Sequence, residues 1–83
     1  MTTQRKQFVG VVLEVSYQGA VLPRAILWPD GRRFEIDTVI DVGQAPMVPA
    51  GTQGLCYTCQ VRTRQAKLYQ DGERWFMEAK GEG

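Results

Sequence analysis

Residues 66–79, "AKLYQDGERWFMEA", decide the fold class of this chain. Two runs rich in aromatic and aliphatic residues flank Asp71-Gly72, and Asp-Gly between such runs is the strongest short-range signal for a tight β-hairpin turn. Because alternate side chains of a strand point to opposite faces, one set is expected to face a core and the other to face away from it. The inward set is Ala66, Leu68, Trp75 and Met77, and the outward set is Lys67, Tyr69, Arg74 and Phe76. The cross-strand pairs predicted for this turn are Gln70 with Glu73, Tyr69 with Arg74, Leu68 with Trp75, and Lys67 with Phe76.

The same two-residue period recurs outward from this hairpin, and no stretch sustains the spacing of an amphipathic helix. Four further runs alternate, at residues 8–17, 24–28, 33–42 and 55–61. The stretch "WPDGR", residues 28–32, has the composition of a tight turn and joins the second run to the third as another hairpin. Residues 43–54, "GQAPMVPAGTQG", are rich in Gly and Pro and predict a loop. This loop exposes Met47 and Val48 unless they fold back onto the barrel or onto a partner.

These runs predict an all-β fold, a small antiparallel barrel or sandwich of five to six strands and of SH3-like or OB-like size. The 83 residues form one domain, 1–83, in which residues 1–6 and 80–83 are expected to be frayed tails. Three sets of residues are each expected to share one strand face: Val9, Val11, Leu13, Val15 and Tyr17; Phe34, Ile36, Thr38, Ile40 and Val42; and Leu55, Tyr57, Cys59 and Val61.

The overall charge excludes strong non-specific attraction to polyanions. The formal net charge is +1 at pH 7, which gives no global field toward nucleic acid or a membrane surface. No apolar run approaches the about 20 residues that span a bilayer, and the polar start "MTTQRKQ" does not read as a signal peptide. A cytoplasmic protein with no membrane partner is expected.

The two cysteines lie in the stretch "LCYTCQV", residues 55–61. On a strand, Cys56 and Cys59 point to opposite faces with Cα atoms about 10 Å apart, whereas a disulfide needs about 4.4–6.8 Å. Redox Cys-x-x-Cys motifs sit at a helix N-terminus, and a chain without histidine or a third cysteine cannot supply four soft zinc ligands. Two free thiols on a strand are therefore predicted, with a redox or metal role as the alternative.

Catalytic and cofactor motifs are not found in the sequence. Without histidine, the commonest general base is missing. Glu35 and Asp37 lie about 7 Å apart on one strand face and could act as paired carboxylates, although solvated surface charges explain them as well. The glycines of residues 43–54 match no phosphate-binding motif. The protein is expected not to be an enzyme and to hold no cofactor and no metal.

The outward face of the last hairpin is the candidate binding face. Its rings could stack on unpaired bases while its cations meet phosphates, and no acidic residue occurs between Val42 and Gln70. In the alternative, Tyr69 and Phe76 are covered by a terminus, by the long loop or by a second subunit. Residues 30–41, with four acids and two arginines, are expected at the opposite pole, where they would repel phosphate. The candidate residues are Lys67, Tyr69, Arg74 and Phe76, with Arg62 and Arg64 on or near the adjacent strand end.

A pattern spread over residues 8–79 resembles a family of small, uncharacterised bacterial β-domain proteins. The shared positions are Trp28, Asp30, Gly31, Phe34, Ile36, Asp37, Val39, Gly54, Tyr57, Cys59, Arg74, Trp75 and Phe76. The resemblance implies a small β domain and carries no activity and no site residue.

The sequence thus favours a non-enzymatic binding or assembly module that acts through a protein partner or through self-association as a homodimer. The alternative is single-stranded nucleic-acid binding through the face of the C-terminal hairpin.

Overall fold

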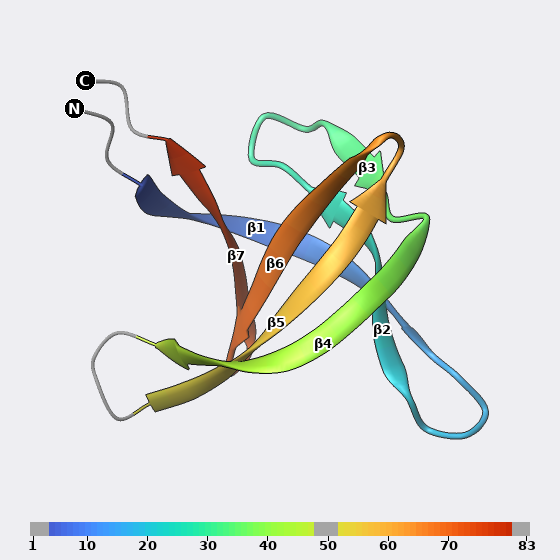
Figure 1. The fold of residues 1–83 in the computed structure, drawn as a ribbon. Helices are drawn as coiled ribbons and strands as arrows, with labels where there is room; N and C mark the ends of the chain where they lie inside the picture. The colour runs from blue at the N-terminus through green and yellow to red at the C-terminus, as the bar shows by residue number, and fades with distance from the viewer. Residues whose placement is uncertain (1–3, 48–51, 81–83) are drawn as a thin grey trace.

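Seven strands make up the fold in the structure, a computed structural model that describes residues 4–47 and 52–80 (Figure 1). In the order β3-β2-β1-β7-β6-β5-β4 they form one antiparallel sheet, which curls into a half-barrel. The all-β prediction is confirmed, but five to six strands is wrong because the run 33–42 is broken in two. No helix in the described ranges is long and apolar enough to cross a membrane. The strands are β1 (Gln4–Val15), β2 (Val21–Leu27), β3 (Arg33–Glu35), β4 (Thr38–Met47), β5 (Thr52–Val61), β6 (Arg64–Asp71) and β7 (Arg74–Lys80).

The break between β3 and β4 is the point where the chain changes partner strands. Ile36 donates its N–H to the carbonyl of Arg24 in β2 (2.9 Å), and the next residue, Asp37, donates to the carbonyl of Gln60 in β5 (2.8 Å). Alternation is lost across this switch and again at a β-bulge between Val39 and Asp41.

The face predicted for the run 33–42 is therefore partly wrong. Ile36 is buried and Phe34 packs against the core, as expected. Further along the run the two faces are exchanged. Val39, predicted to face outward, packs against the core, whereas Ile40, predicted to face inward, is 49% exposed.

β1 pairs with two strands in succession, with β7 through residues 4–9 and with β2 through residues 10–15. Val9 and Val11 pack against the core as predicted. The rest of that predicted face does not reach the core, because the β1–β2 hairpin continues past the body of the sheet (Figure 1). Leu13, Val15 and Tyr17 are exposed, Tyr17 almost completely.

The core lies on the concave side of the sheet and confirms the inward faces of β5, β6 and β7. Its buried members are Ile26, Ile36, Tyr57, Cys59, Leu68 and Trp75. Cys59 is fully buried on this face, while Cys56 is half-buried on the other, so the two free thiols lie on opposite faces as predicted.

The last hairpin keeps its predicted faces but not its predicted register. Tyr69 pairs with Phe76, and Asp71 pairs with Arg74, so the two turn residues are Gly72 and Glu73 rather than Asp71 and Gly72. Gly72 has a φ of +64° at the first central position, the place that a type II′ turn reserves for glycine. The shift moves each pair by two residues, which preserves the faces, and it brings the Tyr69 and Phe76 rings into a stack with centroids 5.1 Å apart.

The loop predicted at residues 43–54 is largely strand, so this prediction was also wrong. Gly43 pairs with Cys56 and Met47 with Thr52, so β4 and β5 form one long hairpin. β4 can include Pro46 because it is an edge strand, where a missing N–H need not break a ladder bond. Val48 and the side chain of Met47 lie outside the described residues.

The predicted tails are also shorter than expected. Residues 4–6 pair with residues 78–80, so β1 and β7 extend into both segments that were expected to fray. Residues 1–3 and 81–83 lie outside the described ranges.

One thiol and two phenols that are wholly or partly buried make the stability of the fold sensitive to alkaline pH. Burial raises the pKa of the Cys59 thiol and of the Tyr57 and Tyr69 phenols. The unfolded chain releases these protons at a lower pH than the native one does, so stability is full below about pH 8.5 and falls as pH rises beyond it. We expect the Tm to decline steadily from about pH 8.5 to 11, measured by circular dichroism. Cys59→Ala should remove the first part of the decline, and a Tm that stays constant to about pH 11 would contradict the prediction.

Candidate binding site

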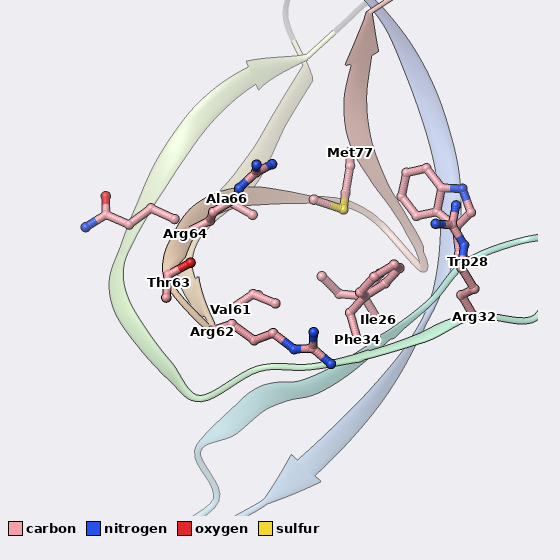
Figure 2. A pocket seen from close by; sticks show the side chains of 11 residues that line it. Ile26, Trp28, Arg32, Phe34, Val61, Arg62, Thr63, Arg64, Ala66 and Met77 are labelled. Carbon is pink, nitrogen blue, oxygen red and sulfur yellow. The ribbon is translucent and has the colours of Figure 1, made fainter.

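A pocket of about 580 Å³ opens at the mouth of the half-barrel, where the β2–β3 and β5–β6 turns come together (Figure 2). Ligand pockets in proteins typically measure about 300–1,000 Å³, so this one has room for a small molecule or one unit of a polymer. It is lined by Ile26, Trp28, Arg32, Phe34, Val61, Arg62, Thr63, Arg64, Gln65, Ala66 and Met77.

The floor and one wall of the pocket are apolar. Ala66 and Met77 face inward from β6 and β7, beside the core residue Ile26. The wall is aromatic: the Trp28 and Phe34 rings meet edge to face, with centroids 6.4 Å apart. Both rings are only half-buried, so they offer apolar surface to whatever enters the pocket.

The aromatic wall is positioned by the turn between β2 and β3. Trp28 donates its N–H to the carbonyl of Arg32 (2.8 Å), and Gly31 donates to the carbonyl of Trp28 (2.9 Å). Gly31 has a φ of +94°, which other residues rarely adopt. Asp30 accepts the N–H of Arg32 (3.0 Å), and this hydrogen bond lowers the pKa of the Asp30 carboxyl.

Three arginines stand around this apolar surface. The guanidinium of Arg32 lies 5.5 Å from the centroid of the Phe34 ring and also pairs with Asp30 (2.6 Å). Figure 2 shows Arg62 reaching across the opening toward Phe34, with Arg64 on the other side of the pocket. In the part of the chain that the structure describes, neither Arg62 nor Arg64 pairs with a carboxylate.

Arg62 is held in place through its backbone. It has a φ of +56°, and it is the first of the two residues between β5 and β6. Its N–H donates to Asp37 Oδ2 (2.8 Å), and its carbonyl accepts a hydrogen bond from Gln60 Nε2 (2.7 Å). Both contacts are made by the backbone of Arg62, and its guanidinium pairs with no carboxylate of the described residues.

The structure divides the six candidate residues into two groups. Arg62 and Arg64 line the pocket, whereas the other four lie on the convex face of the last hairpin. On that face Phe76 is only 4% exposed. It is covered from within the chain, by Tyr69 in a stack, by the edge of Phe8 at 5.9 Å, and by Lys6 with Nζ 4.7 Å from the ring centroid.

The remaining residues of the convex face form a similar internal arrangement. Arg74 lies over the ring of Phe8, at 5.0 Å from its centroid, and Lys67 is exposed. Tyr69 is half-buried, and burial together with the nearby carboxylate of Glu78 raises the pKa of its phenol. Among the described residues of this face, only Tyr69 and Phe8 present ring surface, so it offers less room for stacked bases than the sequence indicated.

Residues 30–41 are not at the opposite pole, and this expectation was wrong. The partner switch after Ile36 brings Asp37 against the backbone of Arg62. Two acids of this segment also pair with arginines beside them. Asp30 pairs with Arg32 and Glu35 with Arg33, and each pairing lowers the pKa of the carboxyl through a hydrogen bond to its arginine.

Of the eleven residues that line the pocket, the candidate residues predicted from the sequence include only Arg62 and Arg64. The sequence pattern assigns Trp28, Arg32 and Phe34 to a turn and its flanking strands, and it assigns Met77 to the core. The sequence does place two aromatic residues and an arginine around the turn at Asp30-Gly31. The residues of that turn, however, do not indicate that it would lie beside Arg62.

The carboxylates considered for catalysis, and the residue types that bind metals, can be located in the structure. Glu35, one of the two carboxylates considered for acid–base catalysis, is bound to Arg33, and Asp37 is bound to the N–H of Arg62. Across residues 4–47 and 52–80, no three His, Cys, Asp or Glu side chains gather as a metal site would require. Comparison with known proteins found no match to a family model, to a curated protein or to a solved structure.

Proposed function

We propose that the protein is a non-enzymatic binding module that holds single-stranded nucleic acid at the pocket of the half-barrel. An unpaired base enters between the Trp28–Phe34 wall and the floor formed by Ala66 and Met77. The flanking phosphates lie on Arg62 and Arg64. The observation that carries the proposal is the combination, around one pocket, of two half-buried rings with the guanidiniums of Arg62 and Arg64, which pair with no carboxylate of the described residues.

The chemistry of the pocket matches that ligand in two respects. Every base has a flat face that can stack on an aromatic side chain, at about 1–3 kcal/mol per base. Arginine binds phosphate through two parallel N–H donors, which gives both affinity and orientation. Two carboxylates contact residues of the pocket, and both are engaged: Asp30 pairs with Arg32, and Asp37 accepts the N–H of Arg62.

Single strands fit better than a duplex. In a duplex the bases are stacked on one another and cannot enter a pocket, whereas an unpaired base can turn into one. The net charge of +1 also supports local contact at a few phosphates rather than a broad electrostatic surface. The OB-like size of the half-barrel adds an analogy at the level of the fold only.

The proposal also includes the compartment. Cys56 and Cys59 are both free thiols, which suits the reducing cytoplasm, where single-stranded nucleic acid is present.

A fluorescence anisotropy titration with a labelled single-stranded oligonucleotide of about 12 nucleotides tests this function. Arg62→Gln and Arg64→Gln should each weaken binding, because each removes a phosphate contact. Each should also reduce the slope of log affinity against log salt by about 0.7. The matched control is Arg33→Gln, since Arg33 is exposed, lies outside the pocket and pairs with Glu35. Absence of binding to both DNA and RNA strands at about 50 mM salt would refute the proposal.

A further inference from the structure

The two edges of the sheet differ in how well they are protected. One edge is β3, which has three residues and carries the ion pair between Arg33 and Glu35. Short length and charge are two of the means by which proteins keep edge strands from pairing with other chains. The other edge is β4, which has ten residues and a single charged side chain, Asp41.

The exposed part of β4 is regular and partly apolar. After the bulge at Ile40, the pairing with β5 runs without a break from Asp41 to Met47. Pro46 has no N–H to donate, so the stretch that can donate from every residue is Asp41 to Ala45. Val42, in the middle of this segment, is 44% exposed although it is on the same face as the core residue Tyr57. No described strand lies beyond β4 (Figure 1). Its outer backbone groups are therefore free to pair.

We propose that β4 of a second copy of this chain pairs antiparallel with β4, about a twofold axis at Val42. Two identical strands that pair antiparallel are related by a twofold axis, so one patch serves both copies. The sheet would then continue from one half-barrel into the other, and the two Val42 side chains would meet on its concave face.

The sequence of β4 is complementary to itself in this register. Its only charge, Asp41, lies opposite Gly43 of the second copy instead of opposite another Asp41. Asp41 and Gly43 share the convex face, because they pair with Thr58 and Cys56 of β5. A Cβ added at Gly43 would meet no atom of its own chain within 4 Å, so space is open there for the carboxylate of the second copy. In the proposed dimer the two Asp41 carboxylates therefore do not face one another, and the two Val42 side chains, exposed in the single chain, become buried.

This inference does not depend on the nucleic-acid proposal, and its tests contain no ligand. Sedimentation equilibrium of the full chain, from about 10 μM to 1 mM, should show a monomer–dimer equilibrium. Val42→Lys should raise the dimer dissociation constant at least about tenfold, because it places two like charges at the twofold axis. Val15→Lys is the matched control, since Val15 is an exposed valine on the β1–β2 hairpin, away from β4, and should leave the equilibrium unchanged.

A cross-linking experiment tests the register itself. Directly opposed residues of antiparallel strands have Cα atoms about 4.5–5.5 Å apart, which is within the range of a disulfide. In a Cys56→Ser background, Val42→Cys should therefore form a disulfide-linked dimer under mild oxidation, whereas Val15→Cys should not. Circular dichroism confirms that each variant is folded.

Three results would overturn the proposal. If the protein is a monomer at every concentration, the dimer proposal is wrong, and β4 would be open to a strand from a different protein. Preferential cross-linking of Val15→Cys would place the interface on the β1–β2 hairpin. A dimer that Val42→Lys does not weaken would show that β4 is not the contact.

Discussion

Trp75→Ala is expected to lower the free energy of unfolding by about 3–5 kcal/mol, the usual cost of truncating a large buried aromatic side chain. Trp75 is only 7% exposed and packs on Tyr57, with ring centroids 5.2 Å apart. Alanine would leave a cavity in the centre of the one core, between β5, β6 and β7. Domains of this size have a total stability of about 5–15 kcal/mol, so the variant should be close to unfolding at 37 °C.

Urea denaturation followed by circular dichroism measures this loss. Trp28→Ala is the matched control, because Trp28 is the other tryptophan and is only half-buried at the pocket. It should lose less stability than Trp75→Ala. A loss below about 1 kcal/mol for Trp75→Ala would show that Trp75 does not belong to the core.

Trp28→Ala is expected to weaken binding of a single-stranded oligonucleotide by about 5- to 150-fold, which corresponds to the loss of one stacked base at about 1–3 kcal/mol. The slope of log affinity against log salt should remain unchanged, because no phosphate contact is lost. Trp28→Phe should retain most of the affinity, since a smaller ring still offers a stacking surface. The same anisotropy titration measures all three proteins at about 50 mM salt.

Tyr69→Ala controls for the convex face. Tyr69 lies on the opposite side of the sheet from the pocket and stacks on Phe76. Its truncation should leave affinity unchanged if the pocket is the site. If Tyr69→Ala lost affinity and Trp28→Ala did not, nucleic acid would bind on the convex face, and the pocket would not be the site. Melting curves for both variants separate loss of binding from loss of folding.

The sequence by itself determined which side chains of a strand share a face, because strand alternation is a property of the local backbone. The inward faces of β5, β6 and β7, with Leu68 and Trp75 buried, follow from that period alone. So does the separation of Cys56 from Cys59. The two-residue shift in the register of the last hairpin gives each residue a new partner on the opposite strand. Because the shift is an even number of residues, every side chain stays on its predicted face of the sheet.

Only the tertiary structure decided register, strand breaks and the site. The turn at Gly72-Glu73 and the bulges in β2–β1 and β4–β5 depend on which strand lies alongside, and local sequence does not contain that information. The pocket depends on it most of all. Trp28 and Arg62 belong to turns far apart in the chain, yet they line the same pocket. The two turns are brought together because consecutive residues, Ile36 and Asp37, form backbone hydrogen bonds to β2 and to β5 respectively. A site made of side chains from two turns exists only once the sheet has curled and brought those turns together.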